Sequence, residues 1–156
     1  MADHPDVRGC VLPLHLYYSV TDHTWVHVQD DGTCRVGMTD VAQNLAGPLL
    51  HAKPKKVGAS RKRGKPVATV ESSKWVGPVK SPISGEITAI NEELATDATV
   101  VNQSPYKRGW IVQMQPSDLD GELGELVTGQ DAVDAYRKRI EDEDIKACEH
   151  VEGFEA

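Results

Sequence analysis

The chain has 156 residues and a formal net charge of −7; hydrophobic residues make up 39% of it and aromatic residues only 5%. This length suits one domain and is too short for a two-domain enzyme. No stretch approaches the roughly 18 consecutive apolar residues of a membrane span, and the N-terminus lacks a basic-then-apolar signal pattern. We therefore expect a soluble, cytoplasmic protein with an aliphatic core and no membrane partner.

The three cysteines are Cys10, Cys34 and Cys148. Their odd number, wide spacing and lack of a CxxC pair argue against a disulfide framework and against a zinc site. The histidines show no ligand spacing, so we expect no metal site. A reducing compartment follows from this interpretation.

Charge is distributed unevenly along the chain. Residues 53–65 carry seven basic side chains and no acid, whereas from residue 116 onward thirteen acids oppose four bases. The basic run contains no aromatic residue on which a base could stack, so we expect no nucleic-acid partner. We interpret it as a solvated loop that docks on an acidic partner surface.

The first half of the chain predicts an irregular segment at 1–22 and then a strand pair at 23–29 and 33–38. Asp31-Gly32 supplies the tight turn between the two strands. Thr39-Asp40 caps a helix that runs to about residue 46 and ends before Gly47-Pro48.

Short strands punctuated by turn residues follow. They are expected at 48–52, 66–71, 76–80, 85–90 and 109–115, with a short helix at 91–94. This pattern is typical of a small barrel or sandwich that is mainly β with short helices.

The C-terminal stretch changes to a helical period. Thr128 and Asp131 resemble a capping box, and Val133, Tyr136 and Ile140 form one apolar stripe. The acidic residues after this helix are expected to be frayed. We thus divide the chain into a segment at 1–22, a barrel at 23–127, and a helix with an acidic tail at 128–156.

One lysine stands where an acylating enzyme could reach it. The strand-like runs at 67–71 and 76–80 flank Ser72-Ser73-Lys74-Trp75, and pairing of the two runs as a hairpin places Lys74 at the tip. The SPISGEI sequence at 81–87 follows. This arrangement resembles the modified-lysine hairpin of biotinyl and lipoyl domains, in which the cofactor supplies the chemistry and the protein supplies its position.

Comparison of the whole chain narrows the resemblance. The motifs HTWV (23–26), VGMTDVAQNLAG (36–47), VESSK (70–74), SPISGEI (81–87) and NQSPYKRGWIVQMQPSD (102–118) together resemble the H protein of the glycine cleavage system. The resemblance implies a barrel-sandwich hybrid fold and a monomeric carrier that is not an enzyme. It also implies covalent lipoic acid on Lys74, attached by lipoate ligase or the lipoyl synthase machinery.

The residues beside this lysine are the other candidate site residues. Glu71, Ser72, Ser73 and Trp75 are expected to contact the modifying enzyme or the lipoyl arm, and the alternative for Trp75 is that it covers the end of the barrel. We expect no catalytic residue in this chain.

Two departures from the family concern the cargo. The residue between His and Trp of the HxW motif is usually Glu and here is Thr24, and an acid usually lies where Pro78 stands. A buried ammonium without a carboxylate is costly, so an aminomethyl cargo is disfavoured. These features resemble the lipoate-binding proteins of the heterodisulfide-reductase-like system, which implies a carrier of sulfur intermediates in sulfur oxidation.

Two alternatives stay open. One is a glycine cleavage carrier that works with glycine decarboxylase, aminomethyltransferase and dihydrolipoyl dehydrogenase, and the other is an unmodified barrel that acts as an interaction module. A subsidiary hypothesis makes Cys10 and Cys148 a thiol relay that passes a persulfide to or from the lipoyl sulfurs. Its alternative is that both are small buried or idle thiols.

Overall fold

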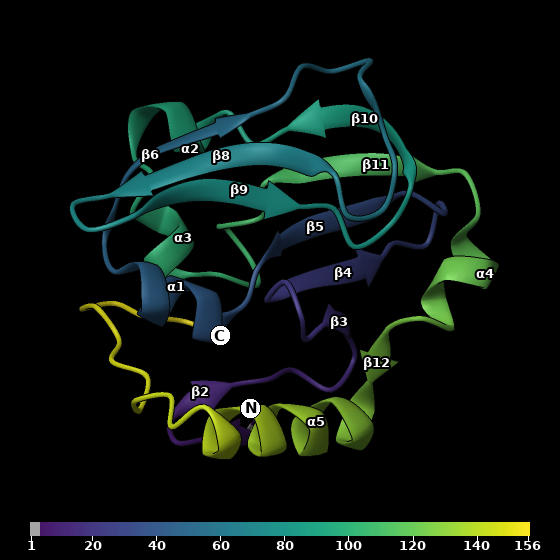
Figure 1. Ribbon diagram of the computed structural model, residues 1–156. Helices are drawn as coiled ribbons and strands as arrows, with labels where there is room; N and C mark the ends of the chain where they lie inside the picture. Colours follow the sequence, from purple (N-terminus) through teal and green to yellow (C-terminus); the bar gives the residue numbers. More distant parts are fainter. Residues whose placement is uncertain (1–3) are drawn as a thin grey trace.

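Two antiparallel sheets face each other across the main hydrophobic core in the computed structural model, which describes residues 4–156 (Figure 1). The larger sheet has the strand order β12-β3-β4-β5-β11-β10-β7 and the smaller sheet the order β6-β8-β9. The larger sheet comprises β3 (Tyr17–Ser19), β4 (Thr24–Val28), β5 (Cys34–Met38), β7 (Ser60–Arg61), β10 (Gly85–Ile90), β11 (Val112–Pro116) and β12 (Val127–Thr128). The smaller sheet comprises β6 (Leu49–Pro54), β8 (Pro66–Ser72) and β9 (Val76–Lys80).

Alternation along the strands builds the core between these sheets. In β8, Val70 and Ser72 are buried while Thr69 and Glu71 are exposed, as the period of two in a strand requires. Val67, Val70 and Val79 of the small sheet share a buried cluster with Val26 and Ile87 of the large sheet. The strands predicted within 23–29, 33–38, 48–52, 66–71, 76–80 and 85–90 are confirmed, and the one predicted at 109–115 begins later, at Val112.

Four short helices connect the strands: α1 (Asp40–Ala46), α2 (Glu93–Thr96), α3 (Val100–Gln103) and α4 (Leu119–Leu123). The predicted limits of α1 are confirmed. The Thr39 hydroxyl accepts a hydrogen bond from the Ala42 N–H at 3.2 Å, and Gly47 follows the helix with φ of 79°. The helix expected at 91–94 lies at α2, and the side chain of Asn91 accepts from the Glu93 N–H.

A long helix, α5 (Gly129–Asp142), covers a second core that it shares with the N-terminal segment. Its stripe of Val133, Tyr136 and Ile140 is buried as predicted. The predicted capping box is wrong, because the Thr128 hydroxyl donates to the Leu16 carbonyl at 2.6 Å instead of capping the helix. None of the helices among residues 4–156 is both long and apolar enough to cross a membrane.

Both terminal segments are more ordered than the sequence predicted. The segment expected to be irregular contains β1 (Asp6–Val7) and β2 (Cys10–Val11), which pair with each other, and β3, which pairs with β4; residues 1–3 lie outside the described part. The tail expected to be frayed is bound to the body by backbone and side-chain hydrogen bonds, such as Glu149 N–H to the Asn44 side chain at 2.9 Å. It runs beside α1 and β2 (Figure 1).

A disulfide joins these segments, so the prediction of three unpaired cysteines is wrong. Cys10 of β2 and Cys148 of the tail are bonded, with their Cα atoms 4.9 Å apart. Sequence spacing could not reveal the bond because the two residues meet only through the packing of α5 on the N-terminal segment. The inference of a reducing compartment rested on unpaired cysteines and loses its basis. Cys34 is free and buried, and burial raises the pKa of its thiol to about 11.

Candidate functional site

The turn between β8 and β9 presents Lys74 at its tip. The Ser72 N–H donates to the Trp75 carbonyl at 2.8 Å, and the Ser72 hydroxyl accepts from the Lys74 N–H at 3.3 Å. Ser72 itself is buried, whereas Ser73 and Lys74 are exposed. Ser72 therefore shapes the turn, and the hairpin predicted from the sequence is confirmed.

A glycine supports the aliphatic stem of this lysine. A Cβ atom at Gly47 would lie 3.2 Å from Cε and 3.7 Å from Nζ of Lys74, and φ of 79° also favours glycine there. The stem thus lies against the backbone at the end of α1. Sequence reasoning assigned Gly47 only to helix termination, because its contact with Lys74 depends on the packing of the hairpin on α1.

Trp75 turns back over its own strand. A Cβ atom at Gly77 would lie 2.9 Å from Cε2 of the Trp75 indole, so the ring occupies the space that a side chain at this position would need. Trp75 remains 42% exposed. Glycine at 77 therefore allows the indole to lie flat beside the lysine and to form one wall of a cavity.

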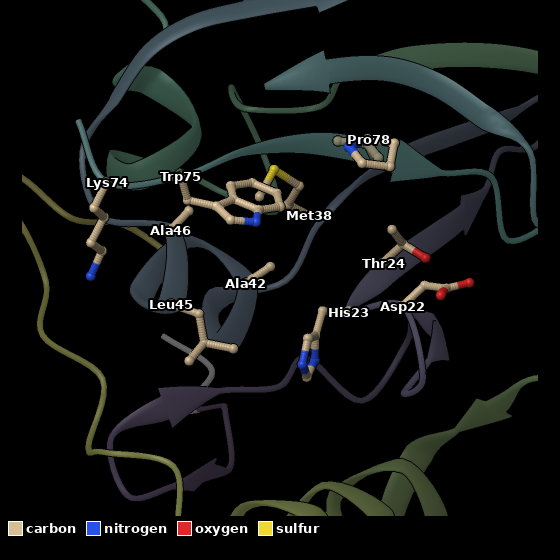
Figure 2. A pocket seen from close by; sticks show the side chains of 11 residues that line it. Asp22, His23, Thr24, Met38, Ala42, Leu45, Ala46, Lys74, Trp75 and Pro78 are labelled. Atoms are coloured by element: carbon tan, nitrogen blue, oxygen red, sulfur yellow. The ribbon is translucent and has the colours of Figure 1, made fainter. Parts of the chain in front are cut away.

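This cavity of about 470 Å³ extends from Lys74 between α1 and the sheet (Figure 2). Its lining is mostly apolar and includes Met38, Ala42, Leu45, Ala46, Trp75, Pro78 and Val79. Lys74 stands at one side, and Asp22, His23 and Thr24 stand at the other. The two positions singled out as departures, Thr24 and Pro78, thus share one cavity. Asp22 and His23 line it as well, and sequence reasoning had assigned neither to the site.

Asp22 is the single carboxylate among the described residues that line this cavity. The Thr24 hydroxyl is buried and has no hydrogen-bond partner within residues 4–156. His23 lies 3.2 Å from the Tyr136 hydroxyl through Nδ1, and its ring stacks on that tyrosine. Burial, and secondarily the nearby Arg139, lower the pKa of His23 to about 4. His23 is therefore neutral near pH 7, and among the described residues of this part of the wall Asp22 is the one with a carboxyl side chain.

The lowered pKa of His23 makes stability depend on pH. The unfolded chain binds a proton near pH 6.5 and the folded chain only near pH 4, so the unfolded state holds more protons between these values. Above pH 6.5 the titration of His23 should not change the free energy of unfolding. This free energy should fall by up to about 3 kcal/mol as the pH drops to 4. Urea unfolding at several pH values measures it.

The matched variant is His23→Asn, because His23 has φ of 56° and asparagine tolerates this backbone region without titrating. It should flatten the stability profile between pH 6.5 and 4. An unchanged profile would show that another group causes the pH dependence.

Asn102 is a site residue that sequence reasoning quoted within a motif but did not assign a role. Its side chain accepts from the Leu49 N–H at 2.9 Å and donates to the Gly47 carbonyl at 2.9 Å and to the Gln43 side chain at 3.1 Å. It is 1% exposed. Asn102 thus fixes the backbone on which the lysine stem lies.

Some of the predicted site residues do not line the cavity beside Lys74. Glu71 and Ser73 are exposed, and no described residue forms a side-chain hydrogen bond with either. The basic segment 53–65 contains the end of β6 and the whole of β7. It leads into β8 at the opposite end of the small sheet, about 20 Å from the lysine turn along β8 (Figure 1). Cys10 and Cys148 form the disulfide. The persulfide relay stays a prediction and now requires that this bond be opened first.

The chain is similar in sequence to a known protein family over most of its length. The model of the family described as "Glycine cleavage H-protein" matches residues 16–139. Glycine cleavage system H protein 2 of Aquifex aeolicus is 42% identical over 144 residues, which cover 92% of this chain and 89% of the relative. The chain belongs to the glycine cleavage H-protein family.

Other relatives extend this result. The probable glycine cleavage system H protein 2 of Saccharolobus solfataricus is 38% identical over 139 residues, covering 88% of this chain and 93% of the relative. A crystal structure of a glycine cleavage system H protein from Mycobacterium marinum superposes with a TM-score of 0.71 at 30% identity, covering 80% of this chain and 98% of that one. The predicted fold class, mainly β with short helices in a lipoyl-type arrangement and with a C-terminal helix, is confirmed.

H proteins are lipoyl carriers and not catalysts, and they hold lipoic acid covalently on a lysine. The prediction of a lipoic acid cofactor is therefore confirmed at the level of the family. The structure of this member places one exposed lysine on a defined turn beside an apolar cavity.

Proposed function

We propose that Lys74 is the lipoyl attachment site and that the cavity beside it receives the lipoyl arm. The observation that carries this proposal is the exposed lysine, which lies on a hydrogen-bonded turn at the rim of a cavity of about 470 Å³. An exposed amine is accessible to a lipoate ligase or a lipoyl synthase system. Hydrogen bonds of Ser72 hold the backbone of the turn that presents this amine.

The residues that line the cavity fit a lipoyl arm. A lipoyl arm is an aliphatic chain that ends in an apolar dithiolane ring, and apolar groups gain free energy when they leave water. Side chains such as Leu45 (46% exposed) and Trp75 (42% exposed) offer it a surface at the mouth of the cavity. When attached, the group supplies the redox-active sulfurs, and this chain binds and orients them.

We assign this carrier to glycine cleavage, the function best supported by its family. The cargo of that reaction is an aminomethyl group, whose amine is cationic. Asp22 is the carboxylate that can pair with this cation at the far side of the cavity from Lys74 (Figure 2). The partners in this function are glycine decarboxylase, aminomethyltransferase and dihydrolipoyl dehydrogenase.

A second candidate is a carrier of sulfur intermediates for a heterodisulfide-reductase-like complex. It is favoured by the absence of a carboxylate at Thr24 and Pro78, both of which line the cavity. A cargo bound to sulfur without an amine needs no countercharge there. The basic segment 53–65, which lies away from the cavity, would dock on an acidic subunit of such a complex.

Transfer of the one-carbon unit distinguishes the two cargoes. Purified lipoylated protein is mixed with glycine decarboxylase and labelled glycine, and the label on the carrier is counted. Glycine cleavage predicts that label accumulates on the wild-type carrier and is absent from Lys74→Arg. A lipoylated carrier that takes up no more label than Lys74→Arg contradicts this assignment and leaves the sulfur carrier as the function.

The variant Pro78→Glu refines the same experiment, because residue 78 is exposed and lines the cavity. If the missing carboxylate limits aminomethyl binding, this variant should accept more label than the wild type. Equal labelling would mean that Asp22 already provides the countercharge.

A further inference from the structure

The Cys10–Cys148 disulfide lies at the border of the second hydrophobic core, with Cys10 inside that core and Cys148 packed against it. Cys10 is 0% exposed, whereas Cys148 is partly exposed and belongs to the tail that follows α5. Thiol–disulfide exchange requires access of a thiolate to one of the two sulfurs. Cys148 is the accessible partner, and Cys10 is the buried one.

The disulfide and Lys74 lie at the two ends of the short helix α1. The Cys148 sulfur lies 3.6 Å from the carbonyl oxygen of Asp40, the first residue of α1. The Lys74 stem lies against Gly47, directly after the last residue of α1. Seven helical residues rise about 10 Å, which is comparable to the length of an extended lipoyl chain.

The tail and the cavity occupy opposite sides of α1. Residues that contact the tail, such as Gln43 and Asn44, lie on one side, and the cavity-lining Ala42 and Ala46 lie on the other. Gly47 continues the side that contacts the tail. In Figure 2 the Lys74 amine points away from the cavity-lining Met38 and Thr24. An arm on this lysine therefore has two directions open to it, one into the cavity and one along the tail.

We infer that the Cys10–Cys148 disulfide exchanges electrons with the lipoyl arm carried on Lys74 of the same chain. This inference rests on the proposed attachment site. In the exchange, the bond between the Cys10 and Cys148 sulfurs breaks, and the bond between the two lipoyl sulfurs forms. The dihydrolipoyl dithiol loses two electrons and two protons, and the two cysteines gain them as thiols. No further oxidant or reductant is needed.

The exchange removes the covalent attachment of the C-terminal tail to β2. While the disulfide is closed, Cys148 is covalently tied to β2, and the neighbouring His150 contacts the buried Asp40 carboxylate at 2.7 Å. In the reduced form only the non-covalent contacts remain. The oxidation state of the arm is thereby linked to the attachment of the segment that runs beside α1.

Selective reduction of the arm tests this inference. Oxidised lipoylated protein is treated with dihydrolipoyl dehydrogenase and NADH, quenched with acid and alkylated, and the label on Cys10 and Cys148 is mapped by mass spectrometry. Both cysteines should be labelled in the lipoylated wild type and unlabelled in Lys74→Arg. A tethered arm presents its thiols at an effective concentration on the order of millimolar, so labelling should be roughly a hundredfold faster than exchange between molecules at about 10 µM.

Two controls separate the outcomes. In a mixture of lipoylated wild type and isotopically labelled Lys74→Arg, the variant's disulfide should stay closed, and its equal reduction would overturn exchange within one chain. A fully alkylated arm beside an intact Cys10–Cys148 bond would overturn the inference altogether. Intact mass is recorded first: a wild type without the lipoyl mass after exposure to ligase and lipoate refutes the attachment site, which is a different failure.

Discussion

Replacement of Cys148 with serine should lower the free energy of unfolding by about 3–5 kcal/mol. The disulfide closes a loop with a sequence separation of 138, so its removal restores much conformational freedom to the unfolded chain. For a chain of this size the loss corresponds to a fall in Tm of roughly 10 °C. Urea unfolding under non-reducing conditions measures it.

A reductant supplies the matched control for this variant. A phosphine reductant should bring the wild type down to the stability of Cys148→Ser and leave the variant unchanged. Coincident unfolding curves for the oxidised wild type and the variant would contradict the disulfide. Cys34 is buried and unpaired, so its thiol should be protected in the folded protein and contribute nothing to this difference.

A second large effect is expected at Gly37, which faces Trp25 across the β4–β5 ladder. A Cβ atom at Gly37 would lie 2.5–2.8 Å from three atoms of the Trp25 indole. The indole cannot move aside easily, because it is 1% exposed and its Nε1 donates to the carbonyls of Met38 and Pro105 at 3.0 Å each. Gly37→Ala should therefore cost about 3 kcal/mol in unfolding free energy.

Gly124→Ala is the control that makes the same chemical change where there is room. Gly124 has an ordinary φ of −65°, and its added Cβ would meet the nearest atom only at 3.5 Å. Its stability should stay within about 0.5 kcal/mol of the wild type. Equal effects at the two glycines would show that the contact between Gly37 and Trp25 does not constrain the fold.

Local signals account for the parts of the fold that the sequence predicted. The alternation of β8, the threonine cap of α1 and the glycine after it act over a few residues, so each can be recognised in the sequence. The exposed lysine between two strands is likewise a local feature. The turn that presents Lys74 could therefore be predicted before any packing was known.

Long-range packing accounts for the parts that the sequence did not predict. The disulfide, the ordered tail and the role of Asn102 each depend on residues that meet only in the folded chain. The capping box failed for a related reason: a more distant carbonyl, that of Leu16, competes for the Thr128 hydroxyl. Asp22 was missed because the sequence alone does not show that it lines the same cavity as Thr24, two residues further along the chain.

Lys74 is the residue on which we expect the lipoyl group. The most direct measurement is peptide mapping by tandem mass spectrometry after lipoate ligase has acted on the wild type, on Lys74→Arg and on the control Lys80→Arg in the same sheet. We expect one lipoyl group on the peptide containing Lys74 in the wild type and in Lys80→Arg, and none on any peptide of Lys74→Arg. A lipoyl group on another lysine, or undiminished modification of Lys74→Arg, would contradict it.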